Sequence, residues 1–172
     1  WSTGARTGAS GSSRRAPRER TRVAVRLTDF LRPEGVLPDL AGRTAPEVLA
    51  ELCRPVAAMH GLDATRLLKT LLDREKLGST GLGYGVAIPH GRLKSIKDTV
   101  CAFVRTREPL PFESPDGQPV RLVLAMLVPE HATEQHLELL SDLAQMFSDP
   151  GLRDQLVAAA DVAAAHRLLT QW

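Results

Sequence analysis

The sequence contains few cysteines and few aromatic residues. Its 172 residues include only two cysteines, Cys53 and Cys101, which lie far apart. This scarcity excludes a disulfide scaffold and a Cys-x-x-Cys zinc or redox site, and it predicts two small buried thiols in a reducing compartment. Aromatic residues make up 4% of the chain, so we expect aliphatic side chains to fill the core.

The sequence also lacks a long apolar run. The longest one, Leu122 to Val128, has seven residues. A helix that spans a membrane needs about 20, whereas a run of this length is typical of a buried strand. We therefore expect a cytoplasmic protein that does not contact a membrane.

Positive charge is concentrated at the N-terminus. Residues 1–22 hold six arginines and one glutamate, a net charge of +5, which leaves −3 for the other 150 residues. The first segment is rich in Gly, Ser and Arg, and we expect it to be a disordered basic tail, followed by one domain over residues 23–172. An export signal at Arg14-Arg15 is a weaker interpretation, because no apolar stretch follows closely. An organelle transit peptide, which would share the Arg and Ser bias, is another weaker interpretation. Since the domain itself is mildly acidic, nucleic acid is not an expected partner.

Capping signals predict the helices. Thr44 and Glu47 form a capping box, and the helix that they open is expected to end at Gly61. Pro55 lies inside this helix and predicts a kink or a break. Further helices are predicted after caps at Asp63 and Thr133, and Pro150-Gly151 is expected to end the second of these. Two short helices are then expected to finish the chain, the last one capped by Asp161.

Apolar runs predict the strands. We expect strands at Asp98–Val104, Leu110–Glu113 and Val120–Val128, the last of them central and covered on both faces. The proline- and glycine-rich stretch that follows Leu31 and ends at Pro38 is predicted to be a turn. Helices, strands and then helices again indicate an α/β domain with a mixed sheet flanked by helices.

A glycine-dense segment, Gly78–Leu93, is the most informative part of the chain. It fails the dinucleotide-binding fingerprint, because Val86 and Ile88 stand where the third glycine must be. It fails the P-loop pattern, because Tyr84 stands where the lysine must be. The chain also has no Gly-x-Ser-x-Gly nucleophile motif.

His90 is the candidate nucleophile in this segment. It follows Pro89, which restricts the backbone, and precedes Gly91, which leaves one side of the ring open. A titratable imidazole in a rigid, accessible loop suits nucleophilic catalysis. The residues alone leave open a surface or core histidine without chemistry.

His136 is the second candidate. With Thr133 as the N-cap it would be the third residue of its helix, on an apolar stripe with Leu140, Leu143 and Phe147. The side chain should therefore point inward near a helix end that is partly positive and favours phosphate. A core or capping histidine fits the same pattern.

Arg74 is the third candidate, since it closes the second helix just before the glycine segment. A cation at a helix C-terminus is ordinary, but its planar donors also suit a phosphoryl group. His131 and His136 lack the spacing and the glutamate of a zinc motif, and no third ligand lies near them, so neither a metal nor a metal-dependent hydrolase is expected. His60 and His166 are expected to be structural.

Two stretches carry a resemblance to a known family. REKLGSTGLGYGVAIPHGRL and QPVRLVLAMLVPEHATEQHLELLSDLAQMF resemble the enzyme IIA component of the fructose–mannitol class (type 2) of the bacterial sugar phosphotransferase system, most of all its nitrogen-regulatory branch. The resemblance runs from about Leu27 to Leu169. It implies the α/β fold given above and a phosphoryl carrier that needs no cofactor.

The resemblance also implies roles for the candidates. His90 would accept the phosphoryl group, through Nε2, from an HPr-like phosphocarrier protein. His136 would hydrogen-bond His90 or the phosphoryl group, and Arg74 would lie near that group. The expected phosphoryl loop comprises Ser79, Thr80, Gly81 and Gly91. Tyr84 departs from the family pattern, in which a small polar residue such as Asn is commoner.

Three functions remain open at this stage. The first is a regulator whose phosphorylation state signals to protein targets. The second is a fructose-specific enzyme IIA that passes phosphate to an enzyme IIB. The third is a binding module in which His90 is never phosphorylated. The sequence shows no enzyme IIB or membrane domain, which favours the regulator.

Overall fold

The computed structural model describes residues 26–172. The predicted basic tail, residues 1–22, lies outside this range. None of the helices in the described range has both the length and the apolar character needed to cross a membrane.

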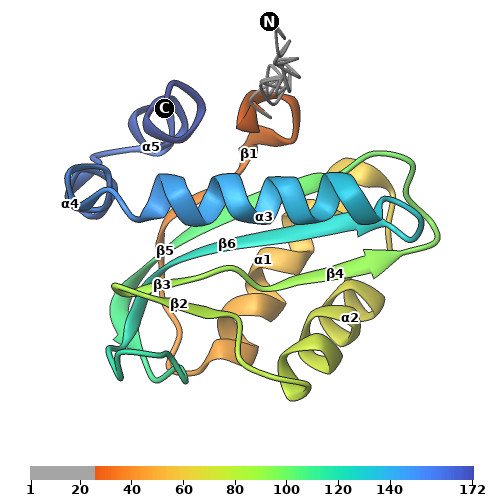
Figure 1. Cartoon of the computed structure of the whole chain (residues 1–172), viewed down its shortest axis with the longest axis horizontal. Helices are drawn as coiled ribbons and strands as arrows, with labels where there is room; N and C mark the ends of the chain where they lie inside the picture. The colour runs from red at the N-terminus through yellow and green to blue at the C-terminus, as the bar shows by residue number, and fades with distance from the viewer. Residues whose placement is uncertain (1–25) are drawn as a thin grey trace, which may run out of the picture.

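A six-stranded sheet forms the centre of the domain (Figure 1). The strands are β1 (Leu31–Leu40), β2 (Gly81–Gly83), β3 (Val86–Ala87), β4 (His90–Leu93), β5 (Val100–Leu110) and β6 (Val120–Pro129). Their order is β1-β5-β6-β3-β2, and β4 also pairs with β6. β6 runs antiparallel to β5 but parallel to β3 and β4. The prediction of a mixed sheet flanked by helices is therefore confirmed.

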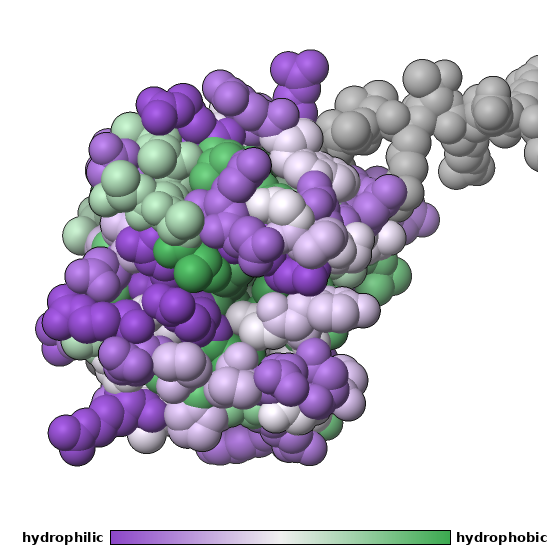
Figure 2. Space-filling model, turned by 90° about the vertical axis from the view of Figure 1, so that its left-hand side faces the viewer, coloured by the Kyte–Doolittle hydropathy of each residue, from purple (hydrophilic) through white to green (hydrophobic). Residues whose placement is uncertain are grey.

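Helices cover both faces of the sheet. The helical elements are η1 (Leu27–Asp29), α1 (Ala45–His60), α2 (Ala64–Lys76), α3 (Thr133–Phe147), α4 (Pro150–Ala158) and α5 (Val162–Thr170). One core cluster packs α1 and α2 against the sheet, and the other packs α3, α4, α5 and η1 against the opposite face. At the α4 end of the molecule, apolar side chains reach the surface in patches among polar ones (Figure 2).

The central strand divides its side chains between the two clusters. Leu122, Leu124 and Met126 belong to the cluster under α3, while Val123 and Ala125 belong to the cluster over α1 and α2. This alternation is the period of a strand that is buried on both faces. The predicted strand Val120–Val128 is confirmed, one residue short of its observed end.

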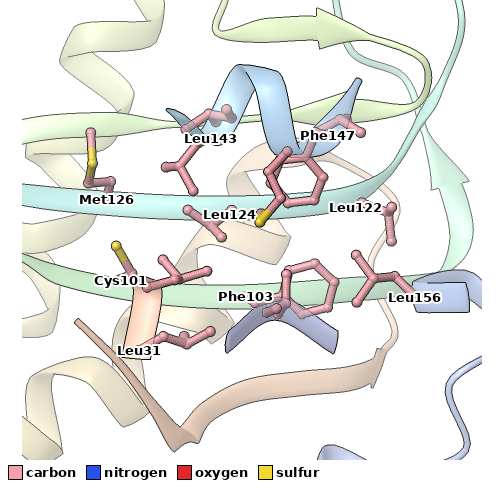
Figure 3. Packing of buried hydrophobic residues seen from close by; sticks show 14 of the residues in the cluster. Leu31, Cys101, Phe103, Leu122, Leu124, Met126, Leu143, Phe147 and Leu156 are labelled. Atoms are coloured by element: carbon pink, nitrogen blue, oxygen red, sulfur yellow. The ribbon is translucent and has the colours of Figure 1, made fainter. Parts of the chain in front are cut away.

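Aliphatic side chains dominate the core under α3, as their abundance in the sequence predicts. Leu143 and Phe147 of α3 lie over the middle of the sheet, close to Leu124, and Phe103 comes from the neighbouring strand β5 (Figure 3). Both cysteines are buried as expected, and burial raises the pKa of each thiol to about 12. These thiols are therefore packing groups rather than reactive ones.

Three predicted helix caps are correct. The Thr44 hydroxyl accepts the Glu47 N–H, and the Glu47 carboxylate reaches back to the N–H of Arg43. Asp63 and Asp161 cap α2 and α5 through their carboxylates. Asp149 caps α4 in the same way, so the break at Pro150 is also a helix start.

The structure departs from two predictions about prolines. The stretch that ends at Pro38 is not a turn but the strand β1, which pairs in parallel with β5 and contains register shifts. An edge strand tolerates proline, because one side of it makes no ladder hydrogen bonds. Pro55 does not break α1, which continues to His60 and ends at Gly61 with a left-handed φ of 64°. Burial of Leu52 and Val56 on either side of Pro55 holds both halves of the helix against the sheet.

Two strand boundaries also differ from prediction. The expected strand Asp98–Val104 begins at Val100 and extends to Leu110, and residues 111–114 are not a strand. β5 is longer because it pairs along most of its length with β6. A non-local partner of this kind leaves no signal in the sequence of β5 itself.

Candidate active site

The glycine-dense segment folds into strands rather than the expected loop. β2 and β3 form a tight hairpin, and His90 is the first residue of β4. Opposite His90 on β6 stands Met126, whose N–H donates to the carbonyl of Pro89 at 2.8 Å. The backbone that carries His90 is therefore fixed to the central strand of the sheet.

One ring nitrogen of His90 has a defined partner. Nδ1 lies 2.8 Å from the carbonyl oxygen of Ile88. A carbonyl oxygen only accepts hydrogen bonds, so Nδ1 carries the proton in this contact. The neutral ring then keeps its lone pair on Nε2, which is the nitrogen available for attack.

The second histidine lies beside the first. The ring centroids of His90 and His136 are 5.1 Å apart, with the planes at 70° in an edge-to-face arrangement. The His136 residue is only 6% exposed, and its Nδ1 has no hydrogen-bond partner among the described residues. The prediction that His136 points inward is confirmed.

The start of α3 differs from the prediction by one residue. The N-cap is Ala132, not Thr133, and no side chain caps the helix there. His136 is therefore the fourth helical residue, and its N–H donates to the carbonyl of Ala132 at 3.1 Å. The ring still lies in the first turn of the helix, where the field of the backbone dipoles is positive.

Both imidazoles are held in the neutral form. Burial is the main cause that lowers the pKa of His90, while the Ile88 carbonyl opposes it. Burial, followed by the neighbouring His90, lowers the pKa of His136 to about 4. At neutral pH the site therefore presents an unprotonated nucleophile beside an uncharged second ring.

Arg74 lies in the last turn of α2, close enough that its charge lowers the pKa of His90 and of His136. Its guanidinium donates to the carbonyl of Gly78 at 2.8 Å. This contact leaves other N–H groups of the guanidinium for an anion beside the two rings.

Glu75 and Thr80 fix the loop between α2 and β2. The N–H and the hydroxyl of Thr80 both donate to the Glu75 carboxylate, at 2.9 and 2.5 Å. The hydroxyl of Ser79 donates to the carbonyl of Glu113 and accepts the N–H of Gly81. These contacts give Ser79 and Thr80 a positioning role, and any part in binding phosphate stays a prediction.

The two glycines of the expected phosphoryl loop permit close packing. A Cβ atom at Gly91 would lie 2.6 Å from Cγ2 of Thr70, and one at Gly81 would lie 2.4 Å from the carbonyl oxygen of Glu113. Gly91 thus lets α2 approach β4 on the face opposite His90.

Sequence reasoning missed Arg92. It stands two residues after His90 on β4, so both side chains leave the same face of the strand. Its side chain is exposed, and its charge lowers the pKa of both histidines. Alternate side chains of a strand lie on the same face, and this pattern would have placed Arg92 beside His90. It could be applied only once β4 was known to begin at His90. No group of three potential metal ligands occurs among residues 26–172.

Comparison with known proteins identifies the family to which the chain belongs. Residues 29–172 match the family model "Phosphoenolpyruvate-dependent sugar phosphotransferase system, EIIA 2". The chain belongs to this family. The resemblance inferred from the sequence is therefore confirmed, and so is the fold that it implied.

Relatives within the family point to its nitrogen-regulatory branch. The nitrogen regulatory protein of Bradyrhizobium diazoefficiens is 40% identical over 143 residues, which cover 83% of this chain and 94% of the relative. The crystal structure of the nitrogen regulatory protein IIA-Ntr from Neisseria meningitidis is also 40% identical, with a TM-score of 0.80 over 84% of this chain and 99% of that one. A fructose-specific EIIA component of Haloferax volcanii is 32% identical over 122 residues, 71% of this chain and 78% of the relative.

Proposed function

We propose that this chain accepts a phosphoryl group on Nε2 of His90 from the phosphohistidine of an HPr-like phosphocarrier protein. Its phosphorylation state would then regulate protein targets in nitrogen or general metabolism. The observation that carries the proposal is the contact between Nδ1 of His90 and the Ile88 carbonyl, which leaves the lone pair on Nε2. Membership of the phosphotransferase family and the nitrogen-regulatory relatives support it.

The bonds and electrons of the transfer balance without a cofactor. The Nε2 lone pair of His90 attacks phosphorus in line with the bond to the donor imidazole. A new N–P bond forms, the old N–P bond breaks, and its electron pair returns to the donor nitrogen. The proton on Nδ1 of His90 stays in place, bound to the Ile88 carbonyl. Because the pKa of His90 is lowered, the ring does not have to lose a proton first.

Fixed positive charge would stabilise the transferred group. Arg74 and Arg92 both act on the two rings electrostatically, and the first turn of α3 adds the partial charge of its N–H groups. His136, kept neutral by burial, can donate one ring N–H to a phosphoryl oxygen. Replacing Arg74 by Ala is expected to slow transfer and leave the fold intact, and an unchanged rate would exclude Arg74 from the reaction.

The test is intact-mass spectrometry after mixing the protein with enzyme I, an HPr-like carrier and phosphoenolpyruvate. We expect the chain to gain one acid-labile phosphoryl group and the variant His90→Ala to gain none. His131, whose side chain is 96% exposed, supplies the control His131→Ala, which should gain phosphate normally. No gain in wild type, with carriers shown to be active, would contradict the proposal and favour a binding module without phosphorylation.

A second candidate function is a fructose-specific enzyme IIA, and the relative from Haloferax volcanii favours it. In this case phosphate would pass from His90 to an enzyme IIB. Adding cognate enzyme IIB proteins to the phosphorylated chain separates the two functions. Rapid loss of the phosphoryl group to one of them would support sugar uptake, and retention would support the regulator. Either role places the protein with its carrier in the cytoplasm.

A further inference from the structure

Ile88 lies between two strands, and its N–H and its carbonyl are each held by a hydrogen bond. β3 ends at Ala87 and β4 begins at His90, so Ile88 belongs to neither strand. Its N–H donates to the carbonyl of Thr80 at 3.0 Å, and its own carbonyl accepts Nδ1–H of His90 at 2.8 Å. The position of the carbonyl that sets the His90 tautomer therefore depends on where Thr80 is held.

Thr80 is held in turn by Glu75. Its N–H and its hydroxyl donate to the two carboxylate oxygens of Glu75, at 2.9 and 2.5 Å. Thr80 is buried, so loss of that carboxylate would leave two buried donors without partners. Glu75 lies in the last turn of α2, and α2 packs against β4 (Figure 1). A continuous series of hydrogen bonds thus joins the end of α2 to the imidazole ring of His90.

We propose that Glu75 is a positioning residue for His90 and acts through Thr80. This inference rests on the proposed function, in which Nε2 attacks phosphorus. With the Ile88 carbonyl in place, the ring proton stays on Nδ1 and the lone pair stays on Nε2. Once that carbonyl moves, either ring nitrogen can carry the proton, and a neutral ring protonated on Nε2 has no lone pair there for the attack.

The charge of Glu75 is a second way in which it acts on His90. Burial lowers the pKa of His90 most, and the charges of Arg74 and Arg92 lower it further. The hydrogen bond to Ile88 and the negative charge of Glu75 raise it. A test of positioning must therefore separate the loss of the charge from the loss of the hydrogen bonds.

Three variants make this separation. Glu75→Ala removes both the charge and the acceptors of Thr80. Glu75→Gln removes the charge but keeps an amide oxygen for the Thr80 N–H and an amide N–H for its hydroxyl oxygen. The matched control is Asp73→Ala, which removes the same charge from the same helix. The carboxylate of Asp73 pairs with Lys69 and Lys76.

Two measurements are made on each variant. Nitrogen-15 NMR of the unphosphorylated, imidazole-labelled protein shows which nitrogen of His90 carries the proton. Mass spectrometry with the phosphorylated HPr-like carrier gives the transfer rate at saturating carrier and the half-saturating concentration. We expect the Nδ1–H tautomer alone in wild type, Glu75→Gln and Asp73→Ala, and a mixture of both tautomers in Glu75→Ala. The saturated rate of Glu75→Ala should fall by about 10- to 100-fold, as a small misplacement of a reacting group does, with half-saturation near wild type.

Several results would overturn the positioning role. One is a wild-type tautomer and rate in Glu75→Ala. Another is an equal loss of rate in Glu75→Ala and Glu75→Gln with the tautomer unchanged, because charge would then account for the effect. An equal loss in Asp73→Ala would assign it to the charge of the helix end in general. If wild type takes no phosphate from an active carrier, the proposed function fails, and the tautomers of wild type and Glu75→Ala still decide whether Glu75 positions the ring.

Thr80 provides a second test that does not require Glu75→Ala to fold. Thr80→Val removes only the hydroxyl contact with Glu75, whereas Thr80→Ser keeps it. We expect a mixture of His90 tautomers and a slower saturated rate in Thr80→Val, and wild-type behaviour in Thr80→Ser. The Nδ1–H tautomer alone in both variants, with equal rates, would contradict the proposal.

Discussion

Nδ1 of His90 is hydrogen-bonded to the carbonyl oxygen of Ile88 at 2.8 Å, two residues earlier in the same segment. The two residues flank Pro89, whose carbonyl is in turn held by the Met126 N–H. The tautomer of the ring is thus set by backbone that cannot shift without disturbing the central strand. This relationship decides which nitrogen can react.

The first prediction concerns the site of phosphorylation. We expect the phosphoryl group only on Nε2 of His90, because Nδ1 holds its proton against the Ile88 carbonyl. Nitrogen-15 and phosphorus-31 NMR of the phosphorylated, imidazole-labelled protein distinguish the two isomers. A phosphoryl group on Nδ1 would show that the contact with Ile88 breaks during the reaction.

The second prediction concerns pH and stability. The pKa of His136 is lowered to about 4, whereas an unfolded histidine has a pKa of about 6.5. Between these values the unfolded chain binds a proton that the folded chain does not bind. The contribution of His136 to stability is therefore complete above pH 6.5 and is lost as the pH falls toward 4.

Urea unfolding at pH 7 and pH 5 measures this effect. We expect His136→Gln to lose less stability than wild type between the two pH values, since glutamine does not titrate. The exposed histidine provides the control His131→Gln, which should keep the wild-type pH dependence. Equal pH dependence in wild type and His136→Gln would count against a buried, neutral His136.

The third prediction concerns Arg92. Removing its charge in Arg92→Ala is expected to raise the pKa of both His90 and His136, because the guanidinium now lowers both. The transfer rate should fall by about tenfold, less than the roughly 10²–10³ that the loss of a buried preorganised donor costs, because Arg92 is exposed. Proton NMR titration of the two rings gives the pKa values, and mass spectrometry gives the rate.

Lys94 provides the control for Arg92. It lies two residues beyond β4 residue Arg92, and its ammonium pairs with Glu130 at 3.6 Å. Lys94→Ala removes the same formal charge from the same surface and should leave the two histidine pKa values and the rate near wild type. If the two variants have the same effect, general surface charge rather than the position of Arg92 accounts for the result.

Local signals explain what the sequence predicted about the fold. The caps at Thr44, Asp63 and Asp161 are contacts within four residues, so the sequence alone contains both partners. The apolar run at 122–128 is equally local, because a strand buried on both faces is almost continuously apolar. β1 and the length of β5 depend on pairing between distant segments, and they were predicted wrongly for that reason.

The same distinction between local and non-local contacts explains what the sequence predicted about the candidate site. The chemistry of His90 was visible in its own segment, but its contact with His136 joins β4 to α3 and was expected only from the family resemblance. Arg92 and Glu75 act through space on His90, and neither position has a motif of its own. Charges of this kind become visible only when the strand and helix that carry them are placed together.

The fourth prediction concerns the packing of α2 on β4. A Cβ atom at Gly91 would lie 2.6 Å from Cγ2 of Thr70, whose rotamer is held by a hydrogen bond from its hydroxyl to the Arg66 carbonyl at 2.9 Å. Gly91→Ala should therefore lower the free energy of unfolding by about 1–3 kcal/mol, the usual range for overpacking. Adding Thr70→Ser removes Cγ2 and keeps the hydroxyl, so the double variant should regain most of the loss. Urea denaturation of the two single variants and the double variant measures this coupling. Additive losses would mean that Gly91 is required for a reason other than its contact with Thr70.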